Sequence, residues 1–362
     1  MSGGKFNCWF YESYDLMALD IKRHVINCDM LASQAVEKLN EFDWFGCFLI
    51  TAYKNKYFLI DDSDIRRGLI KGLKLDQPIC DFIDLEKKSI RAQRQQHDVT
   101  VFLEALAGKE FSPEDFFVLR RCRQKEFDEC SSDFVGIVMA GGFGRRLGKK
   151  TQSMPKPLLP IAGKPIILNA LNFIFCAKPL KTVISTYYLS EQFDQFIRDH
   201  CAENKVTKSQ EVRPLGTAGA IELINEPSAK NYVVVNADVV TDLKLRDLLY
   251  FHHIEENDIT ICLSTYEWMI PFGVVQYSPG GEFTAVLEKP KNSENVAAGI
   301  YVLSALAKTL VKTDEFLNMP DLFERAMALS LKVGVFPLHE YWADLGTPED
   351  FVAAERRLSI DK

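Results

Sequence analysis

The sequence has no long apolar run, no excess of positive charge and no paired-cysteine motif. None of its 362 residues lie in a stretch that approaches the roughly 20 apolar residues of a membrane span. Lys and Arg total 43 against 50 Asp and Glu, and the net charge of −7 offers a nucleic acid no bulk attraction. The nine cysteines include no CxxC and no Cys/His cluster at metal spacing, which indicates free thiols in a reducing compartment. The first residues, MSGGKFNCWF, lack the apolar core of a signal peptide. We therefore expect a cytoplasmic protein with neither nucleic-acid nor membrane partners.

Two common phosphate-binding motifs are missing as well. A GxGxxG turn fails because the sixth position counted from Gly142 is Leu147. A Walker A loop fails because Lys150, rather than Ser or Thr, follows Gly148 and Lys149. A dinucleotide-binding oxidoreductase is therefore the least supported class of enzyme.

The sequence has instead a cationic, glycine-rich loop at the end of an apolar run. AGGFGRRLGKKTQSMPKPLLP, residues 140–160, holds four glycines, five basic residues and no acidic one, and it follows VGIVMA at 135–140. Glycines let the backbone amides approach a phosphate, and Arg and Lys add charge. The loop predicts a polyphosphate site, and the alternative is an exposed basic turn.

The remainder of the chain alternates short apolar runs with amphipathic ones. Strands are predicted at 135–140, 181–187, 232–238 and 259–265, and helices at 165–177, 191–200 and 245–254. This order predicts an α/β fold, a Rossmann-like mixed, mostly parallel sheet flanked by helices. Three later runs, at 272–278, 283–289 and 296–304, predict an antiparallel addition. Ligands of such sheets bind at the carboxyl ends of the strands.

The chain is predicted to hold two domains. A smaller α+β domain covers 1–124, a polar linker covers 125–133, and the α/β domain covers 134–362. The linker is predicted from the polar stretch RQKEFDECSSD at 123–133.

Several motifs of the second domain occur in the order of one known family. GGFGRRLGKKTQSMPKPLLPIAGKP resembles the signature of the sugar-1-phosphate nucleotidyltransferases, GGxGxRL followed by Thr, Pro-Lys-Pro-Leu and Gly-Lys-Pro. VRPLGTAGAI, VVVNADVVTDL, LEKP and EYWADLGTPEDF resemble the later motifs, so the resemblance covers about residues 134–358. It implies a nucleotide-diphospho-sugar transferase fold, and a Mg²⁺-dependent reaction of a nucleoside triphosphate with a sugar-1-phosphate that releases pyrophosphate.

The resemblance also implies roles for individual residues. The implied catalytic residues are Arg146 at the departing pyrophosphate, Lys156 at the α-phosphate and Lys289 at the sugar phosphate. The implied metal ligands are Asp238 and Asp344, since Mg²⁺ prefers carboxylate oxygens. The implied nucleotide-binding residues are Ala140, Gly141, Gly142, Gly144, Arg145, Glu211, Pro214, Gly216 and Thr217, and the implied sugar-binding residues are Gly273 and Glu288.

Three positions depart from the family pattern. Arg145 replaces a more usual Thr, and Ala237 replaces a more usual Gly. Ala297 replaces an Asn that usually touches the sugar or its phosphate, which puts the usual hexose contact in doubt.

Glu211 bears on the choice of base. It lies five residues before Gly216, where the family reads the base, and a carboxylate can accept both the N1–H and the 2-amino group of guanine. An amide would suit uracil or thymine better, so GTP is favoured. UTP, CTP or dTTP, and a Glu211 that is merely a solvated strand end, remain open alternatives.

The first domain resembles a different family. Residues 32–51 and KYFLIDDSDIRRGLIKGLKLDQPICDFI at 56–83 resemble a cystathionine-β-synthase (CBS) module, in which Asp64 would hold the ribose of an adenine nucleotide. Asp61 occupies a position where Thr or Ser is expected, and a second module around 84–124 is degenerate. The alternative is an interaction or dimerisation domain, and we expect a homo-oligomer.

A CBS-like domain before a transferase domain resembles the glucosamine-1-phosphate guanylyltransferases of bacterial legionaminic acid biosynthesis. GDP-glucosamine is therefore the first expected product, and a chain of 362 residues leaves no room for a hexapeptide-repeat domain. A non-catalytic regulatory subunit is the alternative from another class. The joint presence of the five implied catalytic and metal-binding residues argues against it: Arg146, Lys156, Asp238, Lys289 and Asp344.

Overall fold

The computed structural model describes residues 23–42, 47–53, 56–84, 128, 133–144, 147, 151–202 and 204–360. The chain divides into two compact units, Met1–Ser132 with Lys244–Ile254 and Asp133–Leu243 with Glu255–Lys362. The predicted linker at 125–133 lies almost wholly outside the described residues, so the predicted domain boundaries stay predictions. Within the described ranges, no helix combines the length and the apolar character that crossing a membrane requires.

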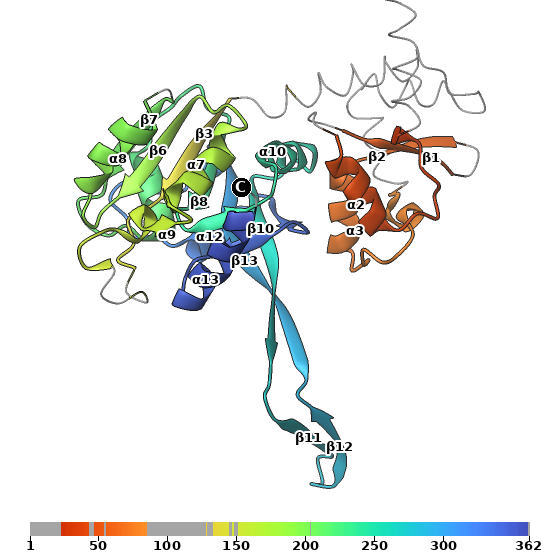
Figure 1. Ribbon diagram of the computed structural model, residues 1–362. Coiled ribbons are helices and arrows are strands. Elements are labelled where there is room, and N and C mark those ends of the chain that lie inside the picture. Colours follow the sequence, from red (N-terminus) through yellow and green to blue (C-terminus); the bar gives the residue numbers. More distant parts are fainter. Residues whose placement is uncertain are drawn as a thin grey trace, which may run out of the picture. The chain divides into compact units, whose positions relative to one another are not determined.

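The second unit is built on a seven-stranded sheet (Figure 1). Across the sheet the strands are β14 (Val333–Pro337), β10 (Ile259–Met269), β13 (Lys291–Ser304), β8 (Asn231–Asn236), β3 (Phe134–Met139), β6 (Lys181–Thr186) and β7 (Val206–Gln210). Four of the six neighbouring pairs are parallel, and β13 is antiparallel to both β8 and β10. The predicted mixed, mostly parallel sheet is confirmed. Of the three runs predicted as its antiparallel addition, only 296–304 joins it, within β13; the runs at 272–278 and 283–289 form a separate two-stranded sheet, so that part of the prediction is wrong.

Helices cover both faces of this sheet. On one face, Val135 and Ile137 of β3 pack in a buried cluster with residues of η4 (Ala220–Leu223) and α12 (Met319–Ala328). On the opposite face, α7 (Ile167–Phe175) packs so closely that a Cβ on Gly136 would lie 2.4 Å from Ile174 Cγ2. A strand buried on both faces reads as a continuous apolar run, which is why VGIVMA predicted β3. The unit also contains α8 (Gln192–His200), α11 (Ala305–Lys308) and α13 (Pro348–Ile360).

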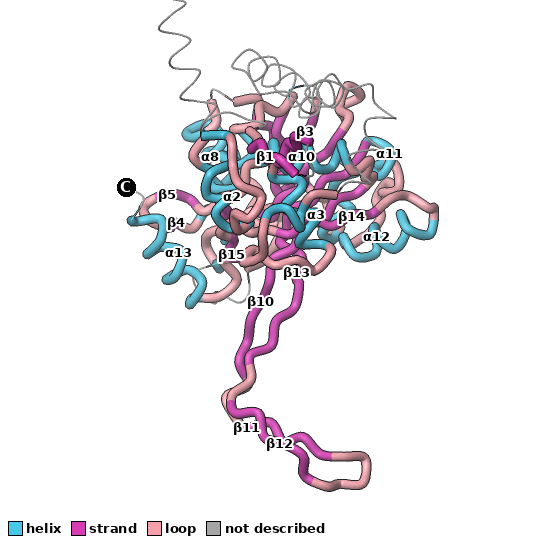
Figure 2. The backbone as a smooth tube through the Cα atoms, turned by 90° about the vertical axis from the view of Figure 1, so that its right-hand side faces the viewer, coloured by secondary structure: helices cyan, strands magenta, loops and turns pink. Residues whose placement is uncertain are grey.

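A two-stranded ribbon, residues 263–297, leaves this sheet. Pairing of β10 with β13 continues from Leu263–Ala297 to Met269–Lys291. Beyond it, β11 (Gly273–Tyr277) and β12 (Phe283–Glu288) pair with each other alone in a separate two-stranded sheet. Figures 1 and 2 show the ribbon projecting from the sheet in two perpendicular views. Most of its side chains are exposed.

The first unit contains a small α+β core. The antiparallel strands β1 (Leu49–Tyr53) and β2 (Lys56–Ile60) accompany α2 (Ala32–Asn40), α3 (Asp62–Ile70), η1 (Ile79–Phe82) and, from later in the chain, α10 (Leu245–Ile254). Its buried apolar residues come from all three early helices and both strands. The helix–strand and strand–helix segments predicted at 32–51 and 56–83 are present, while the CBS relationship stays a prediction. The degenerate second module lies outside the described residues, except at its first position.

Candidate active site

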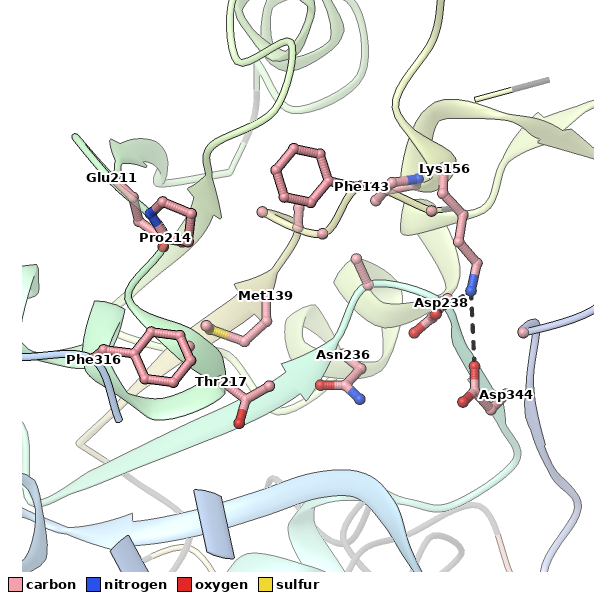
Figure 3. A pocket seen from close by; sticks show the side chains of 18 residues that line it. Met139, Phe143, Lys156, Glu211, Pro214, Thr217, Asn236, Asp238, Phe316 and Asp344 are labelled. Carbon is pink, nitrogen blue, oxygen red and sulfur yellow. Dashed lines mark hydrogen bonds and ion pairs between the residues drawn. The ribbon is translucent and has the colours of Figure 1, made fainter. Parts of the chain in front are cut away.

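A pocket of about 560 Å³ opens at the carboxyl ends of β3 and β8 (Figure 3). These strands lie at the point where the strand order reverses, because β6 and β7 continue on one side of β3 and β8 lies on the other. Crevices at such switch points are the usual ligand sites of open α/β sheets. The lining consists of Met139, Ala140, Gly141, Gly142, Phe143, Gly144, Lys156, Pro157, Glu211, Pro214, Gly216, Thr217, Asn236, Ala237, Asp238, Phe316, Asp344 and Gly346.

The glycine turn after β3 forms one wall. The Ala140 N–H donates to the Ser185 carbonyl oxygen (2.8 Å), which anchors the start of the turn to β6. Gly144 has a φ of +62°, and a Cβ there would lie 2.9 Å from Thr151 Cγ2. Around Gly142, in contrast, a Cβ would meet no described residue within 4 Å. The turn is thus fixed at both ends and open in its middle, where its backbone is accessible to a ligand.

Arg145 and Arg146 belong to the same loop, but both lie outside the described residues. Their predicted roles at the triphosphate stay predictions.

Two carboxylates and one lysine meet at the other wall. Asp238 follows β8, and the next strand, β9 (Val239–Thr241), pairs antiparallel with β15 (Trp342–Asp344), so that Asp344 lies opposite Val239. The ammonium of Lys156, the first residue of η3 (Lys156–Leu158), forms an ion pair with Asp238 and lies 3.9 Å from Asp344 Oδ1 (Figure 3). The structure therefore brings together three residues that are far apart in the sequence.

This arrangement fits a divalent cation. Both carboxylates face the point that the Lys156 ammonium approaches, so their oxygens already attract one positive charge. Mg²⁺ binds commonly through one or two carboxylates and completes its shell with waters and substrate phosphates. The Asp238 and Asp344 side chains are 22% and 43% exposed, which leaves room for such additional ligands.

Glu211 lies deep in the pocket wall, 5% exposed. The Ser185 hydroxyl donates to its Oε1 (3.1 Å), and the Leu215 N–H donates to its Oε2 (2.9 Å). Burial raises the pKa of the Glu211 carboxyl, and these two hydrogen bonds partly oppose the rise. The alternative that Glu211 is a solvated strand end is wrong, because the carboxylate is buried and held from two directions.

The second glycine turn leads into α9 (Gly216–Gly219) and rests against the segment before α12. Gly216 has a φ of +82°, and a Cβ there would lie 2.4 Å from the Leu317 carbonyl oxygen. The same oxygen accepts the Ala218 N–H (2.9 Å), and the Thr217 hydroxyl oxygen accepts the Met319 N–H (2.9 Å). This bonding holds Thr217 at the pocket, and only glycine fits the first position of the turn.

Seven lining residues were not among the predicted site residues: Met139, Phe143, Pro157, Asn236, Ala237, Phe316 and Gly346. Three of them bear on the shape of the pocket. Phe143, within the cationic loop, packs edge-on against Tyr187 with ring centroids 5.8 Å apart. Phe316, which is 62% exposed, enters from the segment before α12. Asn236 ends β8, and its position two residues before Asp238 was the available signal. No local pattern marks Phe316, because its approach to the pocket depends on the contact between two distant segments.

Among the described residues of the second unit, three predicted site residues are absent from the pocket lining. Gly273 and Glu288 are directly opposite each other on β11 and β12, and Lys289 follows with a φ of +46°. All three lie on the ribbon, because the β10–β13 pairing continues outward instead of turning back to the sheet. Their predicted roles at the sugar and its phosphate stay predictions. Ala297 is exposed where the ribbon begins.

Asp64 of the first unit is buried within its own helix turn. Its Oδ2 accepts the Asp61 N–H (3.1 Å), the Asp61 Oδ1 accepts the Asp64 N–H (3.1 Å), and Arg67 forms an ion pair with Asp64. This reciprocal bonding caps α3. The geometry gives Asp64 a structural role, and its binding of a nucleotide stays a prediction.

Comparison with known proteins extends these observations. A sequence model described as nucleotidyl transferase matches residues 135–359. Mannose-1-phosphate guanylyltransferase catalytic subunit beta of Drosophila pseudoobscura pseudoobscura is 30% identical over 223 residues, 60% of each chain. Mannose-1-phosphate guanylyltransferase 1 of Arabidopsis thaliana is 30% identical over 236 residues, 61% of this chain and 63% of that one. The matched region thus spans about 60% of the length of these curated relatives.

Among solved structures, HddC from Yersinia pseudotuberculosis is similar with a TM-score of 0.48 and 23% identity, over 62% of this chain and 99% of that one. The family match spans well over half of the chain and contains every residue that lines the pocket. The chain therefore belongs to the nucleotidyl transferase family.

Proposed function

We propose that the protein is a Mg²⁺-dependent sugar-1-phosphate guanylyltransferase. It transfers GMP from GTP to a hexose- or hexosamine-1-phosphate and releases pyrophosphate. The observation that carries this proposal is the convergence of Lys156, Asp238 and Asp344 beside an accessible glycine turn at the end of β3. The relatives named as guanylyltransferases support the class of reaction and the choice of GTP.

The reaction requires positioning and charge neutralisation rather than a covalent intermediate. A phosphate oxygen of the sugar-1-phosphate attacks the α-phosphorus of GTP, a new P–O bond forms, and the bond to the β-phosphate oxygen breaks as pyrophosphate leaves. Both substrates are anions, so preorganised positive groups and amide dipoles lower the barrier. The backbone at Gly142 and the ammonium of Lys156 supply such groups on facing walls.

Asp238 and Asp344 would hold the Mg²⁺ ion. When bound, the ion supplies positive charge at the phosphate oxygens. The protein's contribution is to fix the two carboxylates next to each other through the β9–β15 pairing and the hydrogen bond from the Leu345 N–H to the Asp238 carbonyl oxygen (3.2 Å). Lys156 places its ammonium beside the reacting phosphate.

Glu211 is proposed to select guanine. Each carboxylate oxygen offers two acceptor directions, and the Ser185 hydroxyl and the Leu215 N–H take one on each oxygen. The second directions accept the guanine N1–H and 2-amino group. Gly141 permits this approach, because a Cβ there would lie 2.8 Å from Glu211 Oε1. Phe316 offers an apolar surface at the same end of the pocket for the base or ribose (Figure 3).

Two sugar-1-phosphates are the leading candidates for the acceptor substrate. Mannose-1-phosphate is supported by the names of the curated relatives, and glucosamine-1-phosphate by the CBS-like segment that precedes the transferase unit. Lys289 is proposed to hold the sugar phosphate, with Glu288 and Gly273 near the sugar hydroxyls. The cytoplasm, where GTP is made and used, is the proposed location.

The experiment is a substrate matrix with product identification. The protein is incubated with Mg²⁺, each of four nucleoside triphosphates and a panel that includes mannose-1-phosphate and glucosamine-1-phosphate, and nucleotide sugars are identified by mass spectrometry. We expect a GDP-sugar from one or a few pairs and none from Asp238→Asn. A product only with UTP, CTP or dTTP would contradict the assignment of guanine to Glu211. Absence of any nucleotide sugar across the matrix would contradict the proposed activity.

A further inference from the structure

The ribbon exposes an unusual amount of apolar surface for a projecting element. Val275 and Val286 are directly opposite each other on one face, and Tyr277 lies opposite Phe283 beyond a register shift. Tyr266 and Trp268 stack lower on the ribbon with ring centroids 6.2 Å apart. Nine large apolar side chains of the ribbon are exposed: Tyr266, Trp268, Met269, Phe272, Val275, Tyr277, Phe283, Val286 and Leu287.

Exposure of so much apolar surface to water is energetically unfavourable. In the described part of the chain, β11 and β12 pair only with each other, and a lone two-stranded hairpin is marginally stable. The nine side chains are distributed over both faces of the ribbon, and the face with Val275 and Val286 also holds Tyr277 and Phe283. At roughly 100 Å² each, these four side chains alone present on the order of 400 Å² of apolar surface, already at the upper range for a monomer. In a reciprocal contact each copy contributes one ribbon face and the surface that receives the other ribbon, together about the 800 Å² per partner of a stable interface.

The ribbon cannot bend back over the pocket of the same chain without breaking hydrogen bonds between β10 and β13. Gly299 of β13 lies at the pocket edge, where a Cβ would be 2.6 Å from Asn236 Nδ2. Lys289 comes ten residues earlier in the sequence, roughly 30 Å away along an extended strand at about 3.3 Å per residue. Seven consecutive residue pairs, from Leu263–Ala297 to Met269–Lys291, fill most of this span. Bending Lys289 back to its own pocket would break part of this ladder.

The described lining of the pocket contains one cationic side chain. That side chain is Lys156, whose ammonium faces Asp238 and Asp344. Arg145 and Arg146, although not described, belong to the loop assigned to the triphosphate. A sugar-1-phosphate brings further negative charge, which calls for a separate cation near the acceptor site.

We propose that the ribbon docks onto a second copy of this chain and that Lys289 of each copy serves the pocket of the other. The exchange is reciprocal, as a two-fold dimer requires, and each apolar ribbon is covered by the partner copy. The role of Lys289 rests on the proposed function, whereas the docking of the ribbon does not.

Complementation between two inactive variants tests the exchange. Lys156→Met damages the pocket and leaves the ribbon intact, and Lys289→Met does the reverse. Differently tagged copies are co-expressed, and mixed dimers are isolated by two successive affinity steps. Each variant alone should lose at least 100-fold in the rate of nucleotide-sugar formation. The mixed dimer should recover about half of the wild-type rate, because one of its two sites then has both lysines.

Three results would overturn the exchange. A mixed dimer as slow as its parents would show that both lysines act within one chain. Full activity of Lys289→Met alone would show that Lys289 serves no pocket. Full activity of a wild-type protein that sediments as a monomer at assay concentration would show that no partner is needed.

Sedimentation tests the docking without any reference to activity. The wild-type chain should sediment as a dimer at micromolar concentration, and a variant with Val275→Lys and Tyr277→Lys should sediment as a monomer. Both side chains are largely exposed, so the substitutions disturb no core, and an unchanged melting temperature confirms this. Gln276→Lys is the matched control, because it places a charge on the opposite face of the same strand and should leave the dimer intact.

A wild-type monomer, or a charged variant that still dimerises, would contradict the docking. If the wild-type dimer forms but no substrate pair reacts, the proposed function fails and the docking is retained.

Discussion

Asp238 and Asp344 are the residues on which the proposed chemistry depends most. Asp238→Asn removes one negative charge and should lower kcat by 100-fold or more, the size of effect seen when one preorganised electrostatic group is lost. Stability should change little, since a partly exposed ion pair contributes at most about 1 kcal/mol. Rate measurements over a range of Mg²⁺ concentrations check both points. Asp242→Asn, which breaks an exposed pair with Arg357 outside the pocket, is the matched control. Equal rates for the two variants would remove Asp238 from the metal site.

Glu211 should make GTP use sensitive to pH. Only the ionised carboxylate accepts two hydrogen bonds from guanine, and burial raises the pKa of Glu211 above the ordinary 4.5. The affinity for GTP should therefore fall as the pH is lowered, at a higher pH than an ordinary carboxyl would cause. Glu211→Gln turns an amide donor toward guanine and should reduce the kcat/KM ratio of GTP to UTP at least tenfold. An unchanged ratio would place base recognition elsewhere.

His252 should make the folded state sensitive to acid. Burial, assisted by the nearby His253, lowers the pKa of His252 from 6.5 to about 3. The unfolded chain then binds a proton below pH 6.5 that the folded chain does not bind until about pH 3. The contribution of His252 to the free energy of unfolding is fully present above pH 6.5. As the pH falls below 6.5, the free energy of unfolding decreases by at most about 1.4 kcal/mol per pH unit. Urea unfolding at pH 7.5, 6.5 and 5.5 should show this slope in the wild type and a shallower one in His252→Gln. Parallel slopes would contradict it.

At the scale of elements, the two glycine turns use glycine for different reasons. A Cβ at Gly216 would collide with the Leu317 carbonyl oxygen, and its positive φ adds strain. Gly216→Ala should therefore destabilise the protein by roughly 2 kcal/mol or more. At Gly142 a Cβ meets no atom of the described residues within 4 Å, so Gly142→Ala should leave the melting temperature unchanged and raise KM for GTP. Thermal unfolding and initial rates on both variants separate the two cases. Equal melting temperatures would contradict the assignment at Gly216.

Elements that are marked by a clear local hydrophobic pattern were predictable from the sequence. VGIVMA and YVVVNAD predicted β3 and β8, because strands buried on both faces are continuous apolar runs. The length of β10 was not predictable. Its apolar run predicted an end at residue 265, but pairing with β13 extends it to Met269 through polar and aromatic residues. The extension depends on pairing with residues of β13, which lie far along the chain. A short sequence window around β10 does not include these partners.

At the scale of the whole molecule, the position of a motif in the sequence did not fix its position in space. Lys156, Asp238 and Asp344 meet because strand ends of one sheet converge, which follows from the topology that the sequence predicted. The Glu288–Lys289 motif instead lies on a ribbon that leaves the sheet. Whether this motif serves a pocket depends on assembly, which the chain's local patterns do not encode.

The most direct test of the central claim is the release of pyrophosphate from GTP and Mg²⁺, followed with and without a sugar-1-phosphate. We predict that release requires both substrates, that no inorganic phosphate accompanies it, and that it falls at least 100-fold in Asp238→Asn. Pyrophosphate formed at the same rate without a sugar phosphate, or GTP left intact with every acceptor while it still binds, would contradict guanylyl transfer at this pocket.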